Sequence, residues 1–155
     1  MIHVRRPTPA DKPAWLRMRR ALWPEDGDSH STEIDQFFAG TIRMLDEVLL
    51  AVTESGEVVG FAELSIRPYA EECATDRVAY LEGWYVEPGS RRQGVGRRLV
   101  AAAEQWASDQ GCTEFGSDAL LDNLTSAAAH RALGFKETVQ LRCFRKNIGT
   151  RREAG

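Results

Sequence analysis

The sequence predicts one mixed α/β domain, and three observations support this fold class. The chain has 155 residues, the length of one ordinary domain with a single hydrophobic core. Apolar residues make up 43% and charged residues 28% of it, the balance of an ordinary globular protein. Segments with a helical spacing of apolar residues alternate with short apolar runs typical of strands, in the order β-α-α-β-β-β-α-β-α-β. No internal repeat or linker divides the chain, so we expect one domain at residues 1–148 and a flexible, polar tail at 149–155.

The first half of the chain predicts a strand, two helices and a hairpin. Pro7 and Pro9 end the first strand, and Trp23-Pro24 ends the first helix. Both helices carry one apolar stripe, and a polar turn around Gly56 separates two apolar runs, which is a hairpin signal. The expected elements are a strand at 2–6, helices at about 11–22 and 33–45, and strands at 48–53 and 58–66.

The second half alternates strands and helices. Pro88-Gly89 ends a strand, and Gly111 and Gly134 are suitable C-terminal caps for two helices. The expected elements are strands at 78–86, 113–117 and 139–146, and helices at 94–110 and 124–133.

Charge, hydropathy and cysteine usage exclude several classes of protein. A formal net charge of −3 lacks the basic surplus of a nucleic-acid-binding domain. No apolar run reaches the roughly 18 residues of a membrane span, and the N-terminus lacks the apolar stretch of a secretory signal. Three scattered cysteines without a C-x-x-C pair fit reduced thiols, which predicts a cytoplasmic location. Three scattered histidines argue against a metal site, and His3 and His30 are expected at the surface or in caps.

Charges of one sign gather in two segments. Residues 22–36 contain no Lys or Arg, and residues 91–98 contain four arginines and no acid. Both can be solvated faces, which charge runs usually are, or one can face a cation and the other an anion. The acids of the first segment are Glu25, Asp26, Asp28, Glu33 and Asp35.

The most informative segment runs from Tyr80 to Arg97. A strand ends at Val86, and a helix begins within Gly94-Val95-Gly96. Unpaired N–H groups and the positive dipole end of a helix bind anions, and glycines let a phosphate approach the backbone. The P-loop string is absent, and the third glycine of a dinucleotide fingerprint would fall at Leu99. The residues alone therefore predict either an anion site or a glycine-rich helix cap without a ligand.

The pattern Arg91-x-x-Gly94-x-Gly96 after a strand, with Leu133-Gly134-Phe135 later, resembles the GNAT superfamily of acetyl-CoA-dependent N-acetyltransferases. The resemblance covers about residues 2–146. It implies a central mixed, mostly antiparallel sheet of about six to seven strands flanked by about four helices. It also implies acetyl-CoA as cosubstrate, with no metal. In the family, the loop holds the pyrophosphate and the end of the preceding strand pairs with the pantetheine arm. The implied cofactor residues are Trp84, Tyr85, Val86, Arg91, Arg92, Gln93, Gly94, Val95, Gly96 and Arg97.

Further motifs resemble the bacterial aminoglycoside 6′-N-acetyltransferases within that superfamily. These motifs are Leu22-Trp23-Pro24 with the following acidic loop, Leu81-Glu82-Gly83, Ser117-Asp118, Asn123 and the stretch from His130 to Phe135. The resemblance implies Trp23, Tyr69, Glu82 and Asp118 as substrate contacts and Asn123 as a further cofactor contact. It implies acetylation of the 6′-amine, antibiotic resistance, and a homodimer paired through C-terminal strands. A polyamine or another small amine is the alternative acceptor, and a CoA-binding module without turnover is the alternative function.

Aminolysis of a thioester requires that the acceptor ammonium first loses a proton. Glu82 is the expected base, because a strand period of two puts it on one face with Trp84 and Val86. The alternative is a structural acid paired with a nearby arginine. Asp118 follows an expected strand, and ligands gather at strand ends, so a site role is favoured there over a surface role.

Two further groups are expected to assist the transfer. Family geometry implies that an unpaired backbone N–H near Tyr85 or Val86 stabilises the oxyanion. His130 stands where many GNAT enzymes have a tyrosine; it can protonate the leaving thiolate or merely pack on its helix. No pattern supports an acyl-cysteine intermediate, so direct transfer in a ternary complex is predicted.

Overall fold

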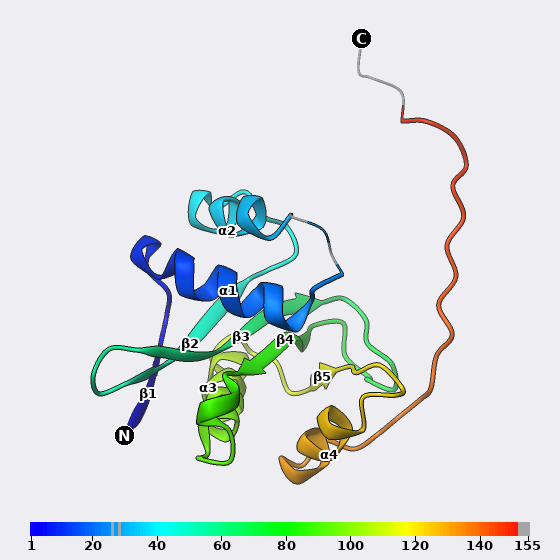
Figure 1. Cartoon of the computed structure of the whole chain (residues 1–155). Helices are drawn as coiled ribbons and strands as arrows, with labels where there is room; N and C mark the ends of the chain where they lie inside the picture. The colour runs from blue at the N-terminus through cyan, green and yellow to red at the C-terminus, as the bar shows by residue number, and fades with distance from the viewer. Residues whose placement is uncertain (26, 28, 152–155) are drawn as a thin grey trace.

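A five-stranded sheet forms the centre of the molecule (Figure 1). The computed structural model describes residues 1–25, 27 and 29–151. The strands lie in the order β1-β2-β3-β4-β5; the first three pairings are antiparallel and β4–β5 is parallel. The predicted mixed, mostly antiparallel sheet is confirmed, with five strands in the described part of the chain instead of six or seven. The strands are β1 (Ile2–Arg5), β2 (Glu47–Thr53), β3 (Val58–Arg67), β4 (Val78–Val86) and β5 (Phe115–Ser117).

Helices cover both faces of the sheet (Figure 1). Helices α1 (Lys12–Leu22) and α2 (His30–Ala39) lie over one face, α3 (Val95–Asp109) lies over the other, and α4 (Leu124–Ala132) lies beside β5. Two short 3-10 turns, η1 (Pro9–Asp11) and η2 (Pro88–Ser90), precede α1 and follow β4. None of the helices in the described residues combines the length and apolarity needed to cross a bilayer.

Alternating side chains of β2 build two cores. Val48, Leu50 and Val52 pack with Trp15 and other residues of α1 and α2. Their neighbours Leu49 and Ala51 pack on the opposite face with the apolar stripe of α3. Because successive strand residues point to opposite faces, one apolar strand can serve both layers.

The second helix is shorter than predicted. It ends at Ala39 instead of about residue 45, because Gly40 adopts a left-handed conformation with φ of 73°. The N–H of Gly40 closes the helix on the carbonyls of Gln36 and Phe37. This is the usual glycine C-cap, so the apolar Ile42 and Leu45 belong to the following loop.

The prediction of a last strand at 139–146 is wrong, because the segment forms no strand in the single chain. From residue 135 to 148 the chain has no regular structure and extends away from the sheet and helices (Figure 1). A strand needs a hydrogen-bonding neighbour, and no described strand of this chain pairs with the segment. Its large apolar residues are exposed: Val139, Leu141, Phe144 and Ile148.

Candidate active site

Strands β4 and β5, at one edge of the sheet, part after Leu81 and Ser117. They pair only from Ala79–Phe115 to Leu81–Ser117, whereas β4 continues to Val86. The N–H of Glu87 donates to the Val59 carbonyl of β3 at 2.8 Å. The N–H and C=O of one strand residue point to the same edge of the strand, and those of the next residue point to the opposite edge. Because Glu87 faces β3, the N–H and C=O of Val86 face the other edge of β4, where β5 has parted from it. A backbone donor is therefore directed into the opening.

The glycine loop after β4 leads into the longest helix. Gly94 is the N-cap of α3 with φ of 78°, and Arg92 also has a positive φ of 63°. The first N–H groups of a helix have no intrahelical partner, so the start of α3 presents donors and a positive dipole end. Arg92 and Arg97 are exposed and make no ion pair with any described residue. The predicted anion site has the required local geometry.

The two glycines of this loop have different roles. A Cβ on Gly94 would meet open space, so its glycine serves the left-handed backbone. A Cβ on Gly96 would lie 2.9 Å from Cζ2 of Trp84. Gly96 therefore lets the indole of Trp84 pack against the first turn of α3, in addition to any approach by a phosphate.

The other predicted cofactor residues line the same region. Arg91 donates from Nε to the Val86 carbonyl at 2.9 Å and lies 5.6 Å from the ring of Tyr85. Gln93 donates to the carbonyl of Gly89 at 3.3 Å, and Val95 is buried in the core. Arg91 thereby fixes the strand end at the point where β4 and β5 part.

His130 is held in one tautomer. Its Nδ1 lies 2.7 Å from the Ser126 carbonyl, which only accepts, so this nitrogen carries the proton. Its Nε2 lies 2.8 Å from Oγ of Ser117, a hydroxyl that also lies 3.3 Å from the Leu81 carbonyl. The ring packs edge-to-face on Trp84 at 5.3 Å, and the buried Nε1 of Trp84 has no hydrogen-bond partner among the described residues. His130 is thereby held between Ser117 of β5 and the indole of Trp84.

A β-bulge sets the direction of Glu82. Glu63 pairs with Gly83 and Leu64 with Leu81, which leaves Glu82 without a partner on β3. The bulge turns Glu82 and Gly83 to the α1 and α2 face, whereas Leu81 and Trp84 pack toward α3. The prediction that Glu82 shares a face with Trp84 and Val86 is wrong, because the period of two breaks at the extra residue.

The Glu82 carboxylate is bound on both oxygens. Its Oε1 accepts from Ser65 Oγ at 2.6 Å and from Arg67 Nε at 2.7 Å. Its Oε2 accepts from Arg67 Nη2 at 2.7 Å. The nearby arginine that a structural acid would need is thus present, and it approaches as a bidentate fork.

Tyr80 joins this pair to Asp118. The guanidinium of Arg67 lies 3.5 Å from the centroid of the Tyr80 ring, and Tyr80 Oη donates to Asp118 Oδ2 at 2.8 Å. Burial, followed by the bond to Asp118, raises the pKa of Tyr80, so the phenol stays protonated and donates. Sequence reasoning missed Ser65, Arg67 and Tyr80. Side chains alternate along β3, which places 63, 65 and 67 on one face. This alternation was the sequence signal that could have identified Ser65 and Arg67.

Trp23 lies directly over the bulge. A Cβ on Gly83 would come within 2.4 Å of its Cη2, so only glycine fits beneath the indole. The indole packs edge-on against Phe61 at 6.2 Å and parallel to His30 at 6.2 Å. Nε2 of His30 donates to the Trp23 carbonyl at 3.1 Å. His30 is 1% exposed, so the surface position predicted as one alternative is wrong, whereas its bond to the C-cap residue of α1 agrees with the other, a capping role; His3 is exposed as expected.

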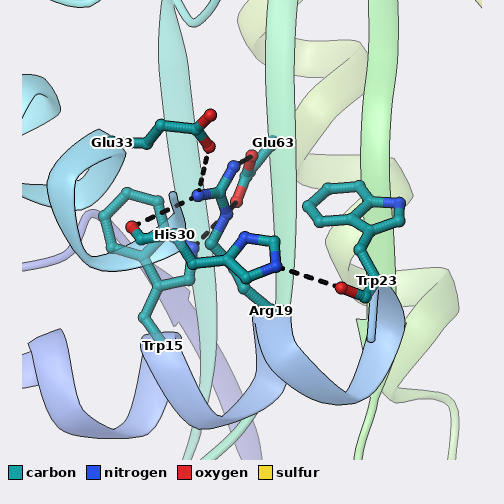
Figure 2. A network of polar contacts seen from close by, with 6 residues as sticks. All are labelled: Trp15, Arg19, Trp23, His30, Glu33 and Glu63. Carbon is teal, nitrogen blue, oxygen red and sulfur yellow. Dashed lines mark hydrogen bonds and ion pairs between the residues drawn. The ribbon is translucent and has the colours of Figure 1, made fainter. Parts of the chain in front are cut away.

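A buried ionic network lies beside Trp23 (Figure 2). Glu63 on β3, which is 1% exposed, lies 2.9 Å from Arg19 Nε and accepts from Trp15 Nε1 at 2.9 Å. Arg19 also donates to Glu33 at 2.7 Å, and its Cζ lies 5.3 Å from the Trp23 ring. Burial raises the pKa of Glu63, while Arg19 and Trp15 act in the opposite direction. The network ties α1, α2 and β3 together under the predicted substrate side.

Two predicted site residues lie apart from this group. Tyr69 is 63% exposed, and its hydroxyl donates to Glu71 at 3.2 Å. Asn123 is the N-cap of α4 and accepts from the N–H of Ser126 at 3.0 Å. The structure thus brings Trp23, Glu82 and Asp118 to one face of the sheet and leaves Tyr69 and Asn123 exposed in loops.

The acidic segment, residues 22–36, is only partly free and extends into α2. Asp26 and Asp28 lie outside the described residues, and Glu25 is exposed. Glu33 pairs with Arg19, and Asp35 pairs with Lys12 at 2.6 Å. In the described ranges, no three His, Cys, Asp or Glu side chains are grouped so as to hold a metal ion.

Comparison with known proteins agrees with this architecture. Residues 15–135 match the model of the Acetyltransferase (GNAT) family. An aminoglycoside N(6′)-acetyltransferase type 1 of Klebsiella aerogenes is 55% identical over 139 residues, which cover 89% of this chain and 91% of that protein. The protein of the same name from Stenotrophomonas maltophilia is 43% identical, over 92% of this chain and 91% of its own length.

Solved structures show the same fold. The aminoglycoside antibiotic 6′-N-acetyltransferase AAC(6′)-Ih from Acinetobacter baumannii superposes with a TM-score of 0.86 at 39% identity, covering 96% of this chain and 100% of that one. AAC(6′)-Iy in complex with the bisubstrate analogue CoA-S-monomethyl-acetylneamine gives a TM-score of 0.84 at 32% identity, with 95% and 99% covered. The chain belongs to the GNAT family of acetyltransferases and, within it, to the aminoglycoside N(6′)-acetyltransferases.

Proposed function

We propose that the protein transfers the acetyl group of acetyl-CoA to the 6′-amine of aminoglycoside antibiotics, and thereby confers resistance. The supporting observation is the parted edge of β4, which has the start of α3 on one side and the acids Glu82 and Asp118, held by Arg67 and Tyr80, on the other. The relatives that share this fold carry that activity in their names, and one of them was solved with a CoA-based bisubstrate analogue.

The residues of the α3 side suit acetyl-CoA. The N–H groups at the start of α3, with Arg92 and Arg97 beside them, would bind the pyrophosphate. The free backbone edge of β4 up to Val86 would hydrogen-bond the pantetheine amides as a neighbouring strand does. When bound, the cosubstrate supplies a thioester that an amine can attack.

On the other face, Glu82 would bind the acceptor and take its proton. From the described residues, Oε1 accepts two hydrogen bonds and Oε2 accepts one, so Oε2 keeps a lone pair for an N–H of the amine. Asp118 and the ring of Trp23 would contact the sugar carrying that amine. The N–H of Val86 would donate to the oxyanion, and His130 would act through Ser117 on the leaving sulfur.

The acceptor class is tested by measuring CoA release with a thiol reagent. We expect turnover with kanamycin and tobramycin and little with spermidine or a peptide, because only the former present a 6′-amine on a ring that the site can position. An aminoglycoside with a hydroxyl at that carbon is the matched control and should not react there. Faster turnover with spermidine would identify a polyamine acetyltransferase instead. Binding of CoA without turnover on any amine would identify a binding module.

We further propose that the protein is a cytoplasmic homodimer in which the segment after Phe135 pairs with a second copy. β5 is the last strand of the sheet, so its outer edge has no partner among the described strands. The segment carries exposed apolar residues such as Leu141 and Phe144 and has strand character. Unpaired sheet edges and exposed apolar segments are each covered when two chains exchange strands. The free cysteines, Cys73, Cys112 and Cys143, suit a reducing compartment.

Truncation after Lys136 should therefore give a monomer. Sedimentation velocity of the full chain is expected to show a dimer, and the shortened chain should sediment at half that mass. Leu141→Glu with Phe144→Glu serves as a second variant that keeps the chain length and should also weaken the dimer. A full-length chain that is monomeric at micromolar concentration would refute the pairing.

A further inference from the structure

Arg67 places a positive charge inside a site for a positively charged acceptor. Its guanidinium binds both oxygens of Glu82 and stacks on Tyr80, whose hydroxyl holds Asp118. These two acids are the groups expected to attract the cationic acceptor. Because like charges repel, Arg67 weakens that attraction, so its presence needs a chemical reason.

The geometry distinguishes this contact from an ordinary surface ion pair. Two parallel N–H bonds of 2.7 Å each and a third bond from Ser65 hold the carboxylate, whose side chain is 23% exposed. The stack on Tyr80 fixes the plane of the guanidinium. A carboxylate held in this way has one orientation, with the unused lone pair of Oε2 directed to one place.

The chemistry of the acceptor supplies the reason. Only the neutral amine attacks the thioester, and a lone carboxylate would stabilise the ammonium form and oppose its deprotonation. The charged and titratable groups facing the guanidinium are Glu82 and Tyr80 of β4 and Asp118 after β5. The hydrogen bond from Glu82 comes first among the causes that raise the pKa of Arg67, so the guanidinium keeps its charge. The positive charge of Arg67 thereby balances the negative charge of Glu82. The amine therefore meets a carboxylate oxygen that belongs to an ion pair without net charge.

We propose that Arg67 is a positioning and specificity residue, which aims Oε2 of Glu82 at the acceptor amine and favours the neutral amine over the ammonium. The inference rests on the proposed function. On binding, the ammonium gives up a proton to solvent or to Glu82. The free amine then attacks the thioester carbonyl, so that the C–N bond forms and the C–S bond breaks. The nitrogen gives up its second proton to become the amide, and the sulfur leaves as thiolate and takes up one proton as the thiol.

Three variants test the role. In Arg67→Gln, kcat should fall at least about tenfold because Glu82 loses its orientation. KM for kanamycin should fall several-fold because the repulsion is gone. In the pH profile of kcat, the rise on the acidic side should shift to higher pH by about one pH unit, because loss of a nearby cation raises the pKa of the bound ammonium. Arg67→Lys keeps the charge and should keep the position of that rise. Arg77→Gln is the matched control: Arg77 lies at the other end of the loop that joins β3 to β4, and among the described residues its side chain donates to the Gln110 carbonyl.

A second measurement does not depend on turnover. Titration calorimetry of kanamycin into the CoA-bound protein, in two buffers with different ionisation enthalpies, gives the number of protons released on binding. The wild type should release more protons near pH 7 than Arg67→Gln does, with Arg67→Lys close to the wild type. Equal release in all variants, or a rise in KM with an unshifted pH profile of kcat, would overturn the role of Arg67 alone. A wild type that neither binds nor acetylates kanamycin would overturn the proposed function, and this inference with it.

Discussion

Glu82→Gln is expected to lower kcat by about two to four orders of magnitude, the usual contribution of a general base. Glutamine keeps an oxygen for Ser65 and Arg67 but cannot take the proton of the amine. Because the bulge turns Glu82 away from Trp84 and from α3, affinity for CoA should stay within about twofold of the wild type. Steady-state kinetics with a saturating aminoglycoside, together with calorimetry of CoA binding, separate the two effects.

The matched control for this substitution is Glu57→Gln. Glu57 is an exposed acid in the turn before β3, so the change removes the same charge at a distance from the site. Its kcat should be unchanged. Near wild-type turnover by Glu82→Gln at neutral pH would show that Glu82 is a structural acid and that the base lies elsewhere.

Arg19→Met is expected to lower the free energy of unfolding by about 3–5 kcal/mol, because it leaves the carboxylate of Glu63 buried without its ion-pair partner. For a chain of this size the melting temperature should fall by about 10 °C or more. Arg17→Met is the control on the same helix: Arg17 pairs with Glu87 at the surface and should matter little. Denaturant unfolding of the three proteins, followed by tryptophan fluorescence, measures the difference.

The instability of Arg19→Met should grow with pH. Burial raises the pKa of Glu63 above its ordinary value of 4.5, and loss of Arg19 removes the main opposing charge. An acid with a raised pKa in the folded state costs stability once the pH exceeds the unfolded value, because unfolding then releases a proton. The gap in the free energy of unfolding between variant and wild type should widen from about pH 5 upward, and a constant gap across this range would contradict the account.

The double variant Arg19→Met with Glu63→Gln keeps an acceptor for Trp15 and should recover part of the loss.

Local sequence signals predicted the sheet, the helices and the glycine loop. These features depend on spacing and on single residues, such as the alternation along β2 and the cap at Gly94. The early end of α2 was also encoded locally, in Gly40, and was outweighed by the apolar spacing of Ile42 and Leu45. A glycine at a helix end is the stronger signal in this case.

The remaining differences arise from contacts between distant residues. Whether β4 carries a bulge at Glu82 depends on how Gly83 and Leu81 meet β3, which no spacing within β4 reveals. The bond of Arg67 to Glu82 joins residues 15 positions apart, and that of Trp15 to Glu63 joins residues 48 positions apart. The segment 139–146 has the composition of a strand, but pairing requires an edge that this chain does not bring to it.

The extra residue in β4 also affects how the protein can evolve. By turning Glu82 away from Trp84, it separates the proposed amine site from the glycine loop at the start of α3. Substitutions around Trp23, Arg67 or Asp118 can then alter which antibiotics are modified without disturbing the start of α3. New resistance spectra can therefore arise from substitutions on the acceptor side alone.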